Sequence, residues 1–199
     1  MGRGLSNPSD GAAMGFMESM ERAREELALA ENSRERAIGK SRALIRASKA
    51  VIHAVHSGAD PTVPLESMES LFGDFPGEDA RWGPVTDALA EYAEARILVA
   101  VAEGCAIPTW ESLGVDPGAW AMGLADSVGE MRRLALGRLM AGDLAGAEAV
   151  FRTMETVADG LMLFDVPDAV VPLRRKQDVA RGVVERTRSD LAVAKVMDG

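Results

Sequence analysis

Four carboxylate side chains have the types and the spacing of a cation site in a helical protein. They form one pair three residues apart and one pair four residues apart: Glu91 and Glu94, and Asp126 and Glu130. Acid pairs of this spacing on two facing helices build oxygen-rich metal sites, and Mg²⁺ or Mn²⁺ prefers such ligands. A bound ion of this kind can activate water against a phosphodiester. In the alternative interpretation, Glu130 pairs with Arg133 on a solvated face, and the other pair meets water or cations of a neighbouring helix.

The first acid pair is placed so that it points toward the protein interior. Its segment, about 83–103, has the composition of a helix, and helical spacing puts Glu91 and Glu94 on one stripe with Leu98 and Val101. On this helix face the two acids are therefore followed directly by apolar side chains. We expect both carboxylates to approach the core.

The second acid pair shares its face with two glycines. In the expected helix of about 117–141, Gly123 and Gly137 lie on the face of Asp126 and Glu130. Glycine costs about 1 kcal/mol in a helix interior, so we expect another element to approach this backbone closely. The opposite face carries an apolar stripe: Leu124, Val128, Met131, Ala135 and Leu139.

A basic stripe follows one face of the first long helix. Its members recur at spacings of four and three residues: Arg42, Arg46, Lys49, His53 and His56. The opposite face is apolar: Leu44, Ala47, Val51 and Val55. Residues 41–56 contain no carboxylate, although the chain as a whole has a formal charge of −9. This segregation of cations indicates an anionic partner, and the alternative interpretation is a solvated face. The two histidines are three residues apart, a spacing that permits metal binding, but we interpret them as the end of the basic stripe.

The composition predicts an all-α protein. Aromatic residues make up 5% of the chain, strong helix formers are abundant, and no hairpin signal stands between alternating segments. Residues 1–14 are rich in Gly, Ser and Pro and are expected to form a flexible tail, followed by a single helical domain over 15–199. Capping and breaker residues predict five main helices and two short pieces: 16–56, 64–71, 83–103, 109–113, 117–141, 144–163 and 172–197.

Several classes of protein are excluded by the sequence. With one cysteine, Cys105, the chain has no internal disulfide, and a four-ligand zinc site is disfavoured. The longest fully apolar run has six residues, Ile97–Ala102, far fewer than the ~18 of a membrane helix. No secretion signal, phosphate-binding glycine loop or nucleophile elbow is present. We expect a soluble cytoplasmic protein without a membrane partner.

Four segments of the chain together resemble the translin family, most of all translin-associated factor X and its archaeal relatives. They are SRALIRASKAVIHAVH (41–56), EYAEA (91–95), GLADSVGEMRR (123–133) and RRKQDVAR (174–181). The resemblance extends from about residue 20 to 195, in order and with matching helix lengths. The segment 123–133 is the most specific of the four.

The resemblance implies a bundle of about seven helices, an octameric homo-oligomeric shell and an Mg²⁺-dependent endoribonuclease acting on single-stranded or unpaired RNA. In that family the catalytic, metal-binding acids occupy E-x-x-E and D-x-x-x-E motifs, here Glu91, Glu94, Asp126 and Glu130. The residues expected to bind nucleic acid are Arg42, Arg46, Lys49, His53 and Arg133. Translin itself resembles a binder without the full acid set. The remaining hypotheses are therefore a non-catalytic protein that binds RNA or single-stranded DNA, and a helical scaffold.

Overall fold

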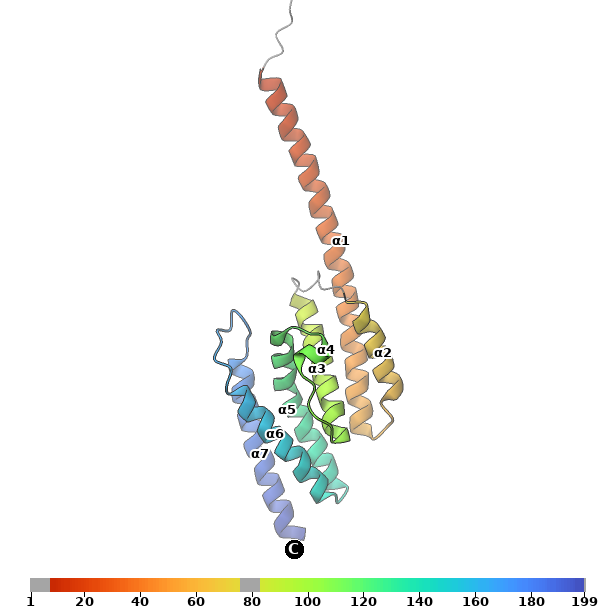
Figure 1. Ribbon diagram of the computed structural model, residues 1–199, viewed down its shortest axis with the longest axis vertical. Coiled ribbons are helices and arrows are strands. Elements are labelled where there is room, and N and C mark those ends of the chain that lie inside the picture. Colours follow the sequence, from red (N-terminus) through yellow and green to blue (C-terminus); the bar gives the residue numbers. More distant parts are fainter. Residues whose placement is uncertain (1–7, 76–82, 199) are drawn as a thin grey trace, which may run out of the picture.

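The computed structural model describes residues 8–75 and 83–198, and every regular element in these two ranges is a helix (Figure 1). The all-α prediction is confirmed. Two of the seven elements, α2 and α4, are the short pieces expected from the sequence. The elements are α1 (Pro8–Ser57), α2 (Thr62–Gly73), α3 (Gly83–Glu103), α4 (Trp110–Leu113), α5 (Pro117–Met140), α6 (Leu144–Leu161) and α7 (Arg174–Asp198).

The first helix begins earlier than the sequence analysis predicted. We expected residues 1–14 to form a flexible tail, but α1 starts at Pro8. Proline is tolerated in the first turn of a helix, and Ala12, Ala13 and Met14, which follow it, are strong helix formers. Residues 1–7 lie outside the described part of the chain.

Local capping chemistry sets the helix limits near the candidate site. The side chain of Asp116 accepts a hydrogen bond of 2.9 Å from the backbone N–H of Ala119, and Pro117 occupies the first helical position of α5. Helix α3 ends at Gly104, whose φ of +71° favours glycine. These boundaries confirm the limits predicted from the sequence, and they fix the positions of the two acid-bearing helices.

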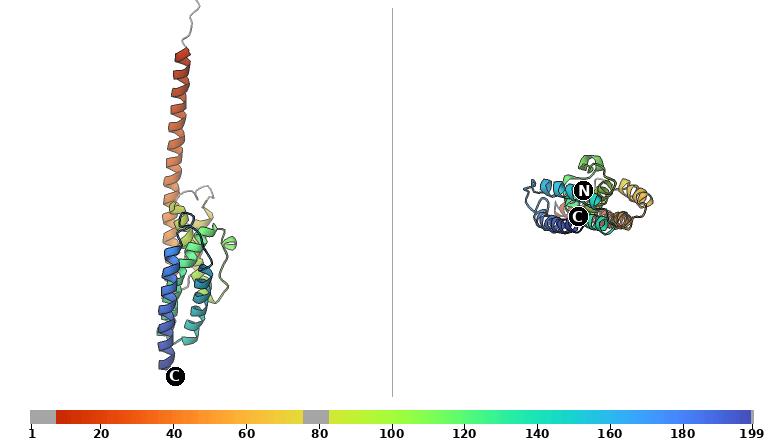
Figure 2. Two further views of the ribbon diagram at one scale, coloured as in Figure 1. Left: turned by 90° about the vertical axis from the view of Figure 1, so that its left-hand side faces the viewer. Right: turned by 90° about the horizontal axis from the view of Figure 1, so that it is seen from below.

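Helix α3 occupies the centre of the bundle, between α1 and α5, with α2 against α1 and with α6 and α7 on the far side of α5 (Figures 1 and 2). One core joins α1, α2 and α3, and it includes Leu44 and Val51, both fully buried as the apolar stripe predicted. A second core joins α3, α5, α6 and α7, and it includes Val128 and Met131. Helix α3 therefore contributes to both cores.

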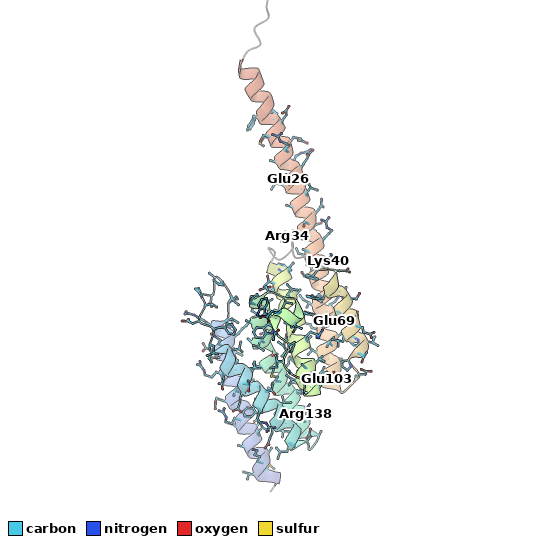
Figure 3. All side chains as sticks on the ribbon, in the orientation of Figure 1. Glu26, Arg34, Lys40, Glu69, Glu103 and Arg138 are labelled. Carbon is cyan, nitrogen blue, oxygen red and sulfur yellow. The ribbon has the colours of Figure 1, made fainter. Side chains whose placement is uncertain are left out.

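The N-terminal part of α1 extends beyond the bundle (Figure 1). Figure 3 shows Glu26 on this part, away from the other helices, and Arg34 nearer to the bundle. The helix reaches the bundle near Ala37, which is buried, and near Lys40, whose Nζ donates to the carbonyl oxygen of Asp74 at 2.6 Å. None of the described helices is both long and apolar enough to cross a membrane.

Candidate active site

The two acid-bearing helices approach each other closely at Gly123. A Cβ atom added there would lie 2.4 Å from the carbonyl oxygen of Ala90 and 2.9 Å from the backbone nitrogen of Glu94. The expected close approach is thus confirmed at Gly123. At Gly137 the expectation was wrong, because nothing lies within 4 Å of an added Cβ. Gly137 lies 14 residues further along α5, beyond the point where the two helices are closest.

An open pocket of about 380 Å³ lies beside this contact, between α1, α3 and α5. Its lining residues are Lys49, Ile52, His53, Glu91, Glu94, Glu130 and Arg133. Asp126, the remaining acid, adjoins the pocket closely enough for its charge to act on both Glu91 and Glu94. Tertiary structure therefore gathers all four sequence-predicted acids in one region, which we call the acid pocket.

The acid pocket changes the pKa values of two of its carboxyl groups. Burial, and after it the charges of Asp126, Glu91 and Glu130, together raise the pKa of Glu94 from its ordinary value of 4.5 to about 8. The pKa of Glu91 is also raised, mainly by burial, although the ammonium of Lys49 opposes that shift. Clustered carboxylates with raised pKa values are a common property of functional sites.

Lys176 of α7 pairs with the acid on α5. Its Nζ lies 2.5 and 2.6 Å from the two carboxylate oxygens of Asp126. This contact was not predicted from the sequence, because the charges of the last helix alternate in sign at spacings of three and four residues, a pattern that favours pairs within one helix. Such pairs do occur: Arg181 lies 3.6 Å from Asp178. Lys176 instead pairs with Asp126, which is 50 residues away in the sequence. The periodicity of a single helix does not reveal a contact between two helices.

His56 has a different environment from the one we predicted. We expected it to continue the exposed basic stripe, but its side chain is only 5% exposed and its Nε2 lies 2.5 Å from a carboxylate oxygen of Glu130. The correction has a simple cause: α5 lies against this end of α1, so the face that is open at Arg46 is covered at His56. Arg133 also approaches Glu130, at 3.9 Å, as the alternative interpretation of that acid suggested.

The rest of the basic stripe is exposed and leads into the acid pocket. Arg42, Arg46, Lys49 and His53 are all exposed on α1. Lys49 and His53 line the pocket itself, and the Nζ of Lys49 lies 3.8 Å from Glu91. An anionic polymer lying along the stripe would therefore pass directly over the four acids.

The donor set of the acid pocket suits a hard divalent cation. All four candidate ligands offer carboxylate oxygens. The pKa of Glu94 is raised first by burial and then by the neighbouring acidic charges, and a bound cation neutralises charges of this kind. In the two described ranges, however, no three His, Cys, Asp or Glu side chains come close enough together to hold a metal as they stand. Lys176 contacts both carboxylate oxygens of Asp126, so metal binding there requires this contact to change, whereas His56 contacts one oxygen of Glu130.

This all-helical fold is shared with known proteins. Over 178 residues the chain is 30% identical to an uncharacterized protein of Methanocaldococcus jannaschii, covering 83% of this chain and 78% of that protein. The structure superposes on two solved structures of AfC3PO, one of them a complex with duplex RNA, with a TM-score of 0.81 and 34% identity. Those matches cover 90% of this chain and 97–98% of AfC3PO.

A third structure extends the likeness in fold. NeC3PO matches with a TM-score of 0.70 over 96% of this chain and all of its own, at 20% identity. No family model matches the sequence. The relatives nevertheless define the class, and the chain belongs to the translin family.

Proposed function

We propose that this protein is a metal-dependent endoribonuclease that hydrolyses RNA within a homo-oligomer. The observation that carries the proposal is the acid pocket, in which carboxylates of α3 and α5 converge at the end of an exposed basic stripe. The complex of AfC3PO with duplex RNA supports RNA as the ligand. Mg²⁺ is the expected cofactor, with Mn²⁺ as a substitute, because both prefer oxygen ligands.

Glu91, Glu94, Asp126 and Glu130 are the residues that would hold the cation. When bound, the cation supplies Lewis-acid stabilisation of the charge that develops on the phosphodiester. Because the pKa of Glu94 is about 8, its carboxyl group carries a proton at neutral pH and must release it before it can act as a ligand. Cation binding is therefore coupled to loss of a proton from Glu94.

Two basic residues hold the acids in place before the cation binds. Lys176 contacts both carboxylate oxygens of Asp126, and His56 donates to Glu130 from a buried position. If Asp126 held the cation, the ammonium of Lys176 would no longer be paired with that carboxylate and would be available to a phosphate oxygen. His56, which is nearly buried, keeps the carboxylate of Glu130 oriented through its hydrogen bond.

The basic stripe supplies the contacts to the RNA backbone. Arg42, Arg46 and His53 are exposed, and Arg133 extends the positive surface from α5. Contacts of this kind to phosphates position a nucleic acid without reading its sequence. In a closed shell the stripes of several copies would face one cavity, which explains how a chain of charge −9 accepts a polyanion. The family resemblance suggests an octamer.

The preferred strandedness of the RNA is a separate part of the proposal. The sequence analysis favours unpaired RNA, whereas the AfC3PO complex contains duplex RNA. The test is incubation of labelled single-stranded and duplex RNA with the purified protein, with Mg²⁺ and with chelator. We expect Mg²⁺-dependent internal cleavage, faster for the single-stranded substrate.

A second candidate function is RNA or single-stranded DNA binding without cleavage. It is favoured by the contacts of two of the acids: Lys176 pairs with Asp126, and His56 pairs with Glu130. Among the residues described, no three potential ligands are close enough together to hold a metal ion. The same incubation separates the two functions. RNA that is bound but remains intact at all Mg²⁺ and Mn²⁺ concentrations would establish the binder and reject the nuclease.

A further inference from the structure

Lys176 brings a positive charge into the acid pocket from a helix that carries none of the four acids. Its Nζ lies 2.5 and 2.6 Å from the two carboxylate oxygens of Asp126. Burial raises the pKa of both Glu91 and Glu94, and the charge of Lys176 opposes that rise. One ammonium group of α7 therefore acts on acids of α3 and of α5 at the same time, as a bound cation would.

The start of α7 is anchored in a way that keeps Lys176 in this position. The side-chain amide of Gln177, the next residue, donates hydrogen bonds of 2.7 and 2.9 Å to two backbone carbonyl oxygens at and just after the end of α6. Leu173, which directly precedes α7, is 2% exposed. The contact with Asp126 is therefore supported by the packing of α7 and is not a chance meeting of two long surface side chains.

A second lysine beside the acid pocket has a looser contact. The Nζ of Lys49 lies 3.8 Å from one oxygen of Glu91, and the side chain of Lys49 is 64% exposed, against 32% for that of Lys176. A short ion pair that is partly withdrawn from water is stronger than a long and exposed one, because less water screens it. Of these two pairs, the one between Lys176 and Asp126 therefore requires more free energy to separate.

The first turn of α7 also offers contacts to phosphate. Arg174 and Arg175 are exposed beside Lys176, and the pair of Arg174 with Asp165 is loose, with a distance of 3.8 Å. Lysine carries three donors on a flexible stem, so its ammonium can turn from a carboxylate to a phosphate oxygen. An RNA phosphate that takes over the ammonium of Lys176 leaves the carboxylate of Asp126 free.

We propose that Lys176 is the internal counterion of the acid pocket and couples the binding of a divalent cation to the binding of an RNA phosphate. This inference rests on the proposed function. A cation held by Asp126 and a phosphate held by Lys176 each require the same ion pair to separate. When both ligands bind, the pair separates only once, so each ligand raises the affinity for the other by the same factor. Without RNA, the pair opposes cation binding.

The test measures the binding of Mn²⁺ to the full-length protein by electron paramagnetic resonance, with and without a short 2′-O-methyl RNA whose integrity is checked on a gel. Lys176→Met and Lys176→Gln remove the counterion, and circular dichroism checks that both variants fold. The matched control is Lys195→Met, because Lys195 lies on the same helix and pairs with Glu148 at 2.7 Å, outside the acid pocket. Asp126→Asn tests whether the cation binds at this pocket.

In the wild type and in Lys195→Met, we expect RNA to raise the affinity for Mn²⁺ at least about fivefold. Both Lys176 variants should bind Mn²⁺ more tightly than the wild type when RNA is absent. The increase caused by RNA should shrink in them to about twofold or less, since the pair that links the two ligands is gone. The reverse titration, of RNA with and without Mn²⁺, should give the same factor for each protein.

The results separate this inference from the proposed function. An equal effect of RNA on the Mn²⁺ affinity of the wild type and of both Lys176 variants would overturn the coupling and leave the nuclease proposal intact. Lys176 variants that bind Mn²⁺ no more tightly than the wild type without RNA would also overturn it. A wild type that binds no Mn²⁺, or that binds it as tightly as Asp126→Asn does, would overturn both the inference and the assigned metal site.

Discussion

The acid pocket and the projecting segment of α1, which we define as residues 15–36, lie at opposite ends of this helix, and they expose opposite kinds of side chain. At the pocket, α1 is packed against α3 and its apolar face is buried, while charged groups such as Lys49 line an open hollow. At the other end, Phe16 and Leu27 are exposed, although a repeat of four and three residues places them on the same face as the buried Val51. One sequence pattern therefore has two outcomes, because burial depends on a neighbour that the pattern does not specify. Substitutions at the pocket should change chemistry or stability, and those on the projecting segment should change neither.

The largest effect is expected for the acids of α5. Asp126→Asn and Glu130→Gln keep the size of the side chains and remove the charge of a ligand, so RNA cleavage should fall about 100-fold or more. RNA binding and helicity should persist. The matched control is Glu103→Gln, an exposed acid outside the pocket. Initial rates on labelled RNA in metal-stripped buffer with Mg²⁺ restored provide the measurement, and undiminished cleavage by both variants would reject the assigned site.

The second largest effect is expected on the stability of the protein, from a substitution at the contact between α3 and α5 that brings the acids together. Gly123→Ala places a Cβ atom against the backbone of Ala90 and Glu94, which should cost about 1–3 kcal/mol and lower Tm by roughly 2–12 °C. The controls, Gly129→Ala and Gly137→Ala, meet nothing within 4 Å and should stabilise the helix by up to about 1 kcal/mol. Thermal unfolding followed by circular dichroism measures all three. Similar Tm changes at all three positions would contradict the close approach.

A smaller effect is expected for charge reversal on the basic stripe. Arg42→Glu with Arg46→Glu should weaken RNA binding about tenfold and flatten its salt dependence by about 0.7 per lost phosphate contact, because fewer counterions are released. These two residues are chosen because Lys49 is paired with Glu91. Arg22→Glu, an exposed residue of the projecting segment, is the control. Titrations at several salt concentrations give both quantities, and an unchanged slope would mean that the stripe is only solvated.

The ionisation of Glu94 predicts a modest dependence of stability on pH. In the folded protein this carboxyl keeps its proton up to about pH 8, whereas its ordinary pKa is 4.5. Between these values the folded state binds more protons than the unfolded state, so stability falls as pH rises. Glu94→Gln cannot ionise and should show a flatter Tm profile in chelator, with a Tm a few degrees above the wild type beyond pH 8. Parallel profiles for both proteins would show that Glu94 ionises normally.

The smallest effect is expected at the projecting segment. Because Met20 and Leu27 lie outside the bundle cores, replacing both by Gln should leave the Tm of the bundle and its cleavage rate within error. Dilute samples measured by circular dichroism and by the RNA assay test this separation. A Tm that fell as far as in Gly123→Ala would mean that the segment packs on its own bundle.

Much of the fold was predictable because it depends on local chemistry. The limits of α3 and α5 follow from Gly104 and from Asp116 with Pro117, which act on the backbone beside them. The four acids were also predictable as a group, since their spacing sets their helix face before any packing occurs. The start of α1 was not predicted correctly. Gly and Ser around Pro8 indicated a flexible tail, although the residues that follow favour a helix.

The contacts between helices were decided only by the tertiary structure. Lys176 reaches Asp126 across 50 residues, and His56 reaches Glu130 across 74, and no periodicity along one helix specifies which neighbour covers a given turn. For the same reason the sequence did not distinguish Gly123, where α3 lies close to the backbone of α5, from Gly137, where nothing lies within 4 Å of an added Cβ. The sequence by itself determined which side chains share a face, because helix geometry is local. Which of those faces are buried, paired or exposed depends on how the helices pack, and that arrangement brings the acids together and leaves the projecting segment of α1 uncovered.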